Sequence, residues 1–283
     1  MGVHMDLPES VYHGAMPLLS QSGMKVLARS PAHFADMDPA ATRKETPAMM
    51  LGTAFHAAVL QPDRFGSMYA VDPKMPKRSN EEKAAWRDWQ AERPRVKLLD
   101  QDDMNMVMAW REAVMGHAGA RTLIESALSE RTTEVTIVWT CPETGVVLKA
   151  RLDAFTEEFN AIIDLKTALT VEPDAYAKAA YDLGYHVQAA HYRSAALDSL
   201  LNAPPDVDFT QIAVEKSSPH IVVNYNISGA PLEAGEAETL RMKRVYAKCM
   251  ETGNWPGYGD GSGWMDLNLP GFARKDIERK ENA

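Results

Sequence analysis

Cysteine is scarce in this 283-residue sequence, which contains only Cys141 and Cys249. Two cysteines so far apart are too few for a disulfide framework or for a structural zinc site. No apolar run approaches the roughly 20 residues that a membrane helix needs. The N-terminus also lacks the basic and then apolar layout of a signal peptide. The sequence therefore predicts a cytoplasmic protein without a membrane association.

An excess of basic residues is missing as well. Lys and Arg number 30 against 39 Asp and Glu, which gives a formal net charge of −9. This balance argues against a surface coated in basic residues. It does not exclude nucleic acid as a ligand, because a local basic groove can lie within an acidic molecule.

The periodicity of apolar residues changes once along the chain. Helical spacing, interrupted by prolines, dominates the first 117 residues, and alternation with a period of two begins at residue 133. Helices are predicted over 49–60, 81–92, 100–117, 182–201 and 232–253, and strands over 133–140, 146–155, 161–168, 208–218 and 220–227.

This order of elements predicts an α/β (α+β) fold with a mixed central β-sheet flanked by helices. The sequence shows no repeat and no low-complexity linker. We therefore expect a single domain over 1–283, with an N-terminal helical segment at 1–48, a core at 49–250 and a C-terminal tail at 251–283.

The predicted strand AIIDLKTA, residues 161–168, combines buried-strand composition with two charges. Asp164 and Lys166 are two positions apart, so both project from one face of the strand. An unpaired charge in such a place costs several kcal/mol, about as much as breaking a buried ion pair. The two residues either neutralise each other as a surface ion pair worth less than about 1 kcal/mol, or they face a ligand that needs both.

The preceding strand offers a second carboxylate. VVLKARLDAF places Lys149, Arg151 and Asp153 on one face, and antiparallel pairing with the next strand would bring Asp153 close to Asp164. Two adjacent carboxylates repel each other unless a cation lies between them. A few hard oxygen ligands suit Mg²⁺ or Mn²⁺ better than zinc.

In such a site Lys166 could hold an attacking water or neutralise charge on a phosphate. Lys149 and Arg151 would then face the backbone of a polyanion. Other polar residues are ambiguous on their own. His56 lies in an apolar helix, where a histidine is more often a core residue than a ligand, and Gln188 and Tyr192 share one face of a later helix.

Four segments taken together, GTAFHAAVLQP, GVVLKARLDAF, IIDLKT and GYHVQAAHY, resemble the nuclease domain of RecE-type exodeoxyribonuclease VIII. That group belongs to the PD-(D/E)XK superfamily, which includes lambda exonuclease and RecB-like nucleases. The resemblance spans nearly the whole chain and is strongest between about 50 and 195. It implies a restriction-endonuclease-like core. Leu152 stands where the superfamily has proline, while both carboxylates are kept.

The resemblance assigns roles to individual residues. It implies His56, Asp153 and Asp164 as ligands of Mg²⁺ or Mn²⁺, with the backbone carbonyl of Leu165 as a further ligand. Lys166 matches the catalytic lysine. Gln188 and Tyr192 match the Q-x-x-x-Y element of RecB-like members, which positions DNA or the site.

The resemblance also implies an activity and partners. The expected activity is processive digestion of one strand of linear duplex DNA, 5′ to 3′, by a ring-shaped homo-oligomer of phage or prophage type. The 3′ overhang would pass to a single-strand annealing recombination protein. Candidate phosphate contacts are Lys77, Arg78, Lys149, Arg151, Lys178 and Arg193.

Three alternatives remain open from the sequence. One is a DNA-binding protein whose nuclease fold is inactive. Another is an endonuclease of the restriction or RecB/Cas4 type, although two distant cysteines cannot hold the iron–sulfur cluster that Cas4-like members often carry. A zinc hydrolase using His56, His186 and His191 is disfavoured, because the last two fall on different sides of a helix.

Overall fold

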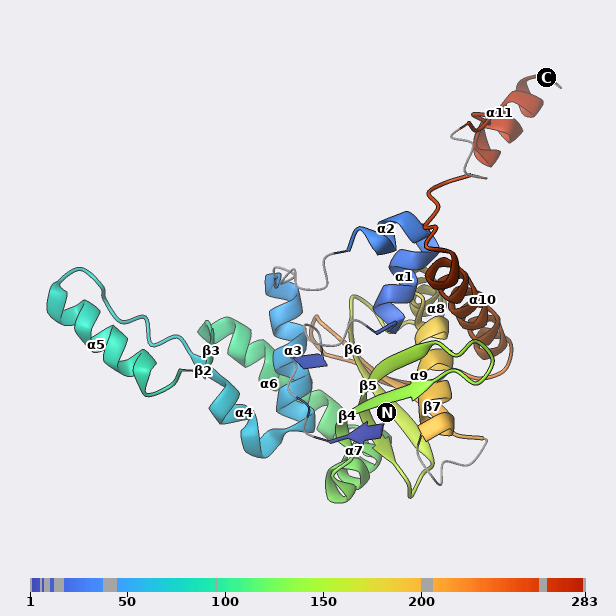
Figure 1. The fold of residues 1–283 in the computed structure, drawn as a ribbon. Helices are drawn as coiled ribbons and strands as arrows, with labels where there is room; N and C mark the ends of the chain where they lie inside the picture. The colour runs from blue at the N-terminus through green and yellow to red at the C-terminus, as the bar shows by residue number, and fades with distance from the viewer. Residues whose placement is uncertain are drawn as a thin grey trace.

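A computed structural model describes residues 2–5, 7, 11–12, 18–37, 45–94, 96–199, 206–259 and 264–281 (Figure 1). The helices are α1 (Gln21–Arg29), α2 (Pro31–Ala35), α3 (Pro47–Leu60), α4 (Pro62–Met68), α5 (Asn80–Ala91), α6 (Gln101–Gly116), α7 (Ala118–Glu130), α8 (Pro173–Asp182), α9 (Tyr185–Ser199), α10 (Ala230–Thr252) and α11 (Gly271–Glu281). The strands are β1 (Gly2–His4), β2 (Tyr69–Val71), β3 (Lys97–Leu99), β4 (Thr133–Thr140), β5 (Val147–Thr156), β6 (Ala161–Ala168), β7 (Asp208–Glu215) and β8 (Val222–Asn226).

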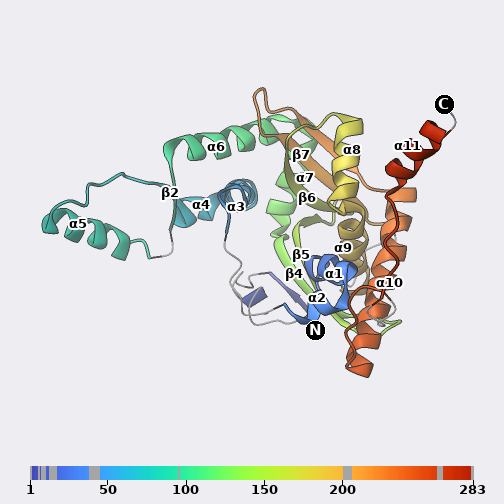
Figure 2. The ribbon, with the colours of Figure 1, turned by 90° about the horizontal axis from the view of Figure 1, so that it is seen from above.

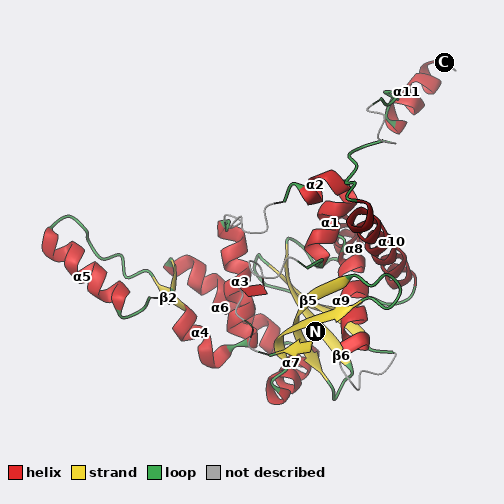
Figure 3. Cartoon of the chain, in the orientation of Figure 1, coloured by secondary structure: helices red, strands yellow, loops and turns green. Residues whose placement is uncertain are grey.

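A six-stranded sheet in the order β1-β4-β5-β6-β7-β8 forms the centre of the fold (Figure 3). Among the described strands of this sheet, only β6 and β7 pair in parallel, and their connection contains α8 and α9, since parallel neighbours need a crossover. The other pairs are antiparallel. The mixed sheet flanked by helices that the sequence predicts is confirmed.

The helix predicted over 182–201 is wrong at its start. Helix α8 ends at Asp182, and Gly184 follows with a φ of +68° before α9 begins at Tyr185. A positive φ favours glycine and interrupts a right-handed helix. The predicted end falls partly on residues 200 and 201, which lie outside the described residues. The predicted tail also contains a helix, α11.

Helices cover both faces of the sheet, and each face has its own apolar core. On one face, α1, α9 and α10 pack around Leu148, Leu152 and Ile162. On the other, α3, α6 and α7 pack around Ile163, Leu165 and Ile212. Consecutive residues of β6 thus serve opposite cores, as strand alternation requires. This strand is buried on both sides from Ala161 to Leu165.

Helix α3 brings an otherwise apolar segment against β5 and β6. The Thr46 side chain accepts a hydrogen bond from the Met49 amide at 3.2 Å, and Pro47 occupies the first turn, where its missing N–H costs nothing. Ala54, Phe55 and the following residues are buried in the second core. The helix therefore holds His56 at the edge of that core.

An arm leaves the body between α4 and α6. Strands β2 and β3 pair in parallel at the base of the arm, where the chain leaves the body and comes back to it. The loop and helix α5 between these strands project outward (Figures 1 and 2). The Ser79 side chain caps α5 through a capping box with Glu82. No residue of this helix is buried. In the part of the chain that the structure describes, no helix is long and apolar enough to cross a membrane.

His191 fixes α9 to the sheet. Its Nε2 donates a hydrogen bond to the Lys149 carbonyl of β5 at 3.0 Å, and its buried Nδ1 lacks a hydrogen-bond partner among the described residues. Burial lowers the pKa of His191 to about 4. A protonated ring would place a charge and an unpaired N–H in the core.

We predict that acid weakens the fold through His191. Its pKa is lower in the folded chain than the usual 6.5 of an unfolded one, so unfolded chains bind the extra proton between pH 6.5 and 4. This group alone should remove about 3 kcal/mol of unfolding free energy over that range. Urea denaturation at pH 7, 5.5 and 4.5 should show a smaller acid loss for His191→Gln. Equal losses in both proteins would contradict the prediction.

Candidate active site

Two carboxylates meet where the β5–β6 ladder opens. The last backbone pair at this end joins Ala154 to Ile163, and the next pair in that register would be Asp153 with Asp164. Instead, the Asp153 carboxylate accepts a hydrogen bond from the Leu165 amide at 2.8 Å. A side chain thus takes the place of a strand carbonyl, and the two strands separate around the carboxylates.

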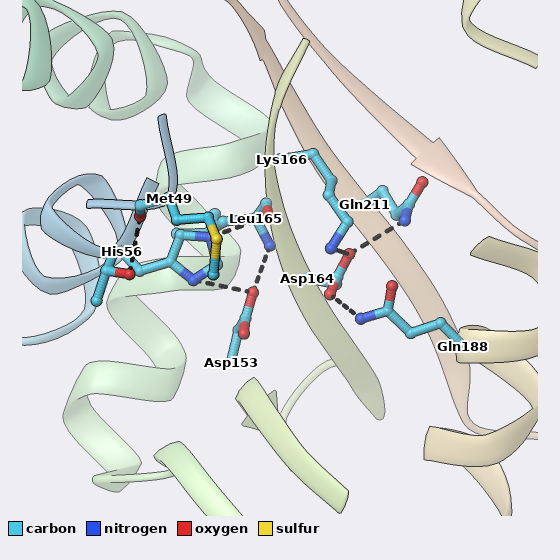
Figure 4. A network of polar contacts seen from close by, with 9 residues as sticks. Met49, His56, Asp153, Asp164, Leu165, Lys166, Gln188 and Gln211 are labelled. Carbon is cyan, nitrogen blue, oxygen red and sulfur yellow. Dashed lines mark hydrogen bonds and ion pairs between the residues drawn. The ribbon is translucent and has the colours of Figure 1, made fainter. Parts of the chain in front are cut away.

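His56 faces the first carboxylate from α3 (Figure 4). Its Nδ1 lies 3.4 Å from Asp153 Oδ2, and its Nε2 lies 3.1 Å from the Leu165 carbonyl oxygen. Burial lowers the pKa of His56, but the charge of Asp153 and its hydrogen bond more than offset this, so the pKa is raised. Both contacts suit a protonated imidazole, which donates from each nitrogen.

Asp164 lies on the other side of β6 from His56 (Figure 4). Its Oδ2 contacts Lys166 Nζ at 2.6 Å and accepts from Gln211 Nε2 at 3.1 Å, while its Oδ1 accepts from Gln188 Nε2 at 2.7 Å. Asp164 is 1% exposed. The ion pair between Asp164 and Lys166 that the sequence offered as one alternative is present, but it is buried and does not lie on the surface of the strand.

The two carboxylates have opposite pKa shifts. Burial raises the pKa of Asp164, and the nearby charge of Asp153 raises it further against the opposing effect of Lys166. Burial acts in the same direction on Asp153, but His56, Lys166 and the Leu165 amide together lower its pKa. The pKa of Lys166 is raised, because the two carboxylates outweigh its desolvation. The site therefore balances two anions with two adjacent cations.

Helix α9 supplies the predicted Gln and Tyr. Gln188 contacts Asp164 directly, and Tyr192 lies against Gln188, whose hydrogen bond partly offsets the burial that raises the pKa of Tyr192 well above 10. Tyr185, one turn before Gln188 at the start of α9, has its ring centroid 5.0 Å from Lys166 Nζ. The structure thus brings His56, Asp153, Asp164, Leu165, Lys166, Gln188 and Tyr192 into one region.

The fold around this region matches a described protein family. A model of the "PDDEXK-like domain of unknown function (DUF3799)" matches residues 20–267, most of the chain. The chain belongs to this family. The PD-(D/E)XK part of the expected resemblance is confirmed, and the RecE-type assignment stays a prediction.

The fold of this chain is similar to a crystal structure of a "Putative exonuclease" from Eubacterium rectale. The two chains are 12% identical, with a TM-score of 0.60 over 94% of this chain and 96% of that one. At this identity the likeness shows the fold alone. No curated protein matches the sequence.

The donor set of the PDDEXK-like domain fits a hard divalent cation. In the part of the chain that the structure describes, no three His, Cys, Asp or Glu side chains are arranged as a metal site. Asp153, Asp164 and the Leu165 carbonyl nevertheless offer the oxygen ligands that Mg²⁺ and Mn²⁺ prefer, and His56 adds a nitrogen. A metal ion would compete with the proton on His56 and with Lys166 for these groups.

The zinc alternative has no support in the geometry. His191 donates to a backbone carbonyl, and the ring of His186 stacks on Tyr181 with centroids 5.4 Å apart. Neither residue is among the contacts of His56.

Three of the predicted phosphate contacts are used inside the fold. Lys149 is 6% exposed, and its Nζ donates to the Tyr12 carbonyl oxygen at 2.5 Å. Arg151 donates to Thr136 Oγ1 at 3.0 Å and to the Leu7 carbonyl. Both side chains are thus held against Leu7 and Tyr12, so their contact with phosphate stays a prediction that this geometry does not favour.

Arg193 is also turned inward. It donates to the Val207 carbonyl at 2.7 Å, pairs with Glu236, and its side chain is 13% exposed. Lys178 is exposed but pairs with Asp182 at 2.6 Å. Lys77 and Arg78 precede α5 on the arm, and α5 projects away from β5 and β6 (Figure 2).

Sequence reasoning missed Gln211, which is fully buried on β7. Parallel pairing places it directly opposite Asp164, and its Oε1 accepts from the Tyr176 hydroxyl at 3.1 Å. Tyr176 in turn stacks on Tyr225 with ring centroids 4.6 Å apart. A lone amide in the apolar run DFTQIAVE is the signal that could have drawn attention to it.

Lys25 of α1 was missed as well. Burial lowers its pKa, and repulsion by Lys166 lowers it further, which places Lys25 within electrostatic range of the site. The sequence of α1 does not indicate that Lys25 lies near Lys166, because only the packing of α1 against α9 and α10 brings it to that place.

We predict that Lys166 is needed to keep Asp164 charged in the fold. Lys166→Met leaves a buried carboxylate without its counter-charge and should lower the unfolding free energy by about 3 kcal/mol in EDTA. The double variant Asp164→Asn/Lys166→Met removes both charges and should lose less. Chemical denaturation of the three proteins measures this, and a double variant at least as unstable as Lys166→Met would contradict it.

Proposed function

We propose that this protein is a metal-dependent exodeoxyribonuclease that digests one strand of linear duplex DNA. The observation that carries the proposal is the meeting of Asp153, Asp164 and Lys166 with His56 at the opened β5–β6 ladder of a PDDEXK-like fold. Two buried carboxylates beside a lysine are suited to phosphodiester hydrolysis, where charge on a phosphate must be neutralised.

The residues proposed to hold Mg²⁺ or Mn²⁺ are His56, Asp153, Asp164 and the Leu165 carbonyl. The metal, when bound, would supply a Lewis acid for the phosphate and a more acidic water. Lys166 orients that water and stabilises negative charge through its ammonium group. Gln188, supported by Tyr192, holds the Asp164 carboxylate in place.

The proposed reaction adds water to a backbone phosphorus and breaks its bond to the 3′-oxygen. The products are a 5′-phosphate and a 3′-hydroxyl. Digestion from 5′ to 3′ would leave a 3′ overhang for a single-strand annealing recombination protein. This polarity, the ring-shaped oligomer and the phage or prophage setting rest on the RecE-type resemblance, whereas the cytoplasmic location is an expectation from the sequence itself.

Exonuclease action is favoured over internal cleavage by the same resemblance and by the structural likeness to a chain described as an exonuclease. The buried cysteines, Cys141 and Cys249, are both free, so they add no support for a Cas4-like iron–sulfur protein. An inactive, DNA-binding relative is the remaining alternative, and activity measurements distinguish it.

We predict that Asp164→Ala and Lys166→Ala each lower the rate of DNA digestion by about 1000-fold, because either change removes about 4 kcal/mol of transition-state stabilisation. Release of nucleotides from linear duplex in Mg²⁺ measures the rate, and EDTA should abolish it. Lys248→Ala, an exposed change on α10, serves as the control. Digestion by either site variant at the control's rate would refute the site.

The mode of cleavage is predicted from the ends of the substrate. Linear duplex labelled at one 5′ end should lose its label first, whereas closed circular duplex should remain intact. Rapid linearisation of the circle would instead identify an endonuclease, and early loss of a 3′ label would reverse the proposed polarity.

A further inference from the structure

The arm, the segment 72–96 between β2 and β3, has a structure that its own packing does not explain. Its helix α5 buries no residue and is about 18 Å long (Figures 1 and 2). An exposed helix of 12 residues is marginal in water without packing. Something other than a core orders this segment.

A stack of side chains provides that order. The rings of Trp86 and Trp89 lie 5.5 Å apart at an angle of 12°. Lys77 Nζ lies 3.6 Å from the ring centroid of Trp86, and the guanidinium of Arg93 lies 4.9 Å from that of Trp89. Each tryptophan thus has a cation on it, and such contacts are worth about 0.5–1 kcal/mol at exposed sites. The stack fixes two cations from the loops before and after α5.

The arm is basic in an acidic protein. It contains seven Lys and Arg against five Asp and Glu, a net charge of +2, whereas the whole chain carries −9. Lys83 and Arg87 line a hollow of about 430 Å³ with Asn80 and Trp86. Among the described residues, no acidic side chain pairs with Lys83 or Arg87. Positive charge is therefore concentrated and available on this element.

We propose that the arm binds the phosphate backbone of duplex DNA, as a contact separate from the catalytic site. Charge complementarity favours this partner, since unpaired cations around a shallow hollow suit phosphates. A protein partner is disfavoured, because none of the large exposed apolar side chains of the described residues lies on the arm and stable protein interfaces have an apolar centre.

The location of the arm fits this role. It joins the body through α4, which directly follows α3, the helix that carries His56. Duplex held by the arm would lie beside the α3 side of the site and remain bound while a strand end is processed. The inference rests on the proposed function for its substrate, but its test measures binding and not cleavage.

The test uses Lys83→Glu/Arg87→Glu in the full chain with Asp164→Ala, which prevents digestion. Affinity for a fluorescent 30-base-pair linear duplex is measured by anisotropy between 50 and 200 mM salt. We expect about tenfold weaker binding and a plot of log affinity against log salt that is less steep by about 2. The control is Lys248→Glu/Lys275→Glu, exposed residues outside the arm with the same change in net charge.

Equal affinity and salt dependence in the arm variant and the control would overturn the proposal. So would loss of self-association by the arm variant with unchanged DNA affinity, which would show a protein interface. The two proposals fail separately. If the wild type digests DNA but the arm variant binds DNA like the control, the proposed nuclease function is kept and the arm proposal is rejected. If the arm variant binds more weakly but the wild type does not digest DNA, the arm proposal is kept and the nuclease function is rejected.

Discussion

The neutralisation of two buried carboxylates is the constraint on which the site depends. Asp153 and Asp164 come from neighbouring strands and repel each other, and burial makes each charge more costly. His56 contacts one and Lys166 the other. Each pairing is local, so the site has no spare positive charge. A divalent cation is the kind of ligand that could replace these contacts without leaving an anion unpaired.

The geometry of β6 explains why the contact of His56 with Asp153 and the contact of Lys166 with Asp164 lie on opposite sides of the strand. Its side chains alternate between two cores, so Asp164 and Lys166 face α9, whereas the Leu165 side chain packs with α3 and α6. The Leu165 backbone then contacts Asp153 and His56 on the second side. A single three-residue segment thus links both helical layers, and displacement of either layer would alter the site.

Local pattern was enough to predict β4 to β8, helices α3, α5, α6 and α10, and the closeness of Asp153 to Asp164, because alternation and antiparallel register follow from adjacent residues. Gln211 could not be predicted in this way, since it reaches Asp164 through a parallel pairing that depends on the crossover through α8 and α9. The surroundings of Lys149 and Arg151 could not be predicted for a related reason. Their strand alternates as an exposed one would, but distant residues at the N-terminus cover it.

The inward contacts of basic residues such as Lys149 and Arg151 affect how an acidic chain could bind DNA. Lys149 and Arg193 are held within the fold by backbone carbonyls, and Lys166 is held by the Asp164 carboxylate. Positive charge for a long polyanion must then come from elements that leave the core. The cations of the arm meet that condition. If the arm binds DNA as proposed, substrate attraction is separated from the two carboxylates, so the site can remain nearly neutral while the projecting element contacts the phosphates.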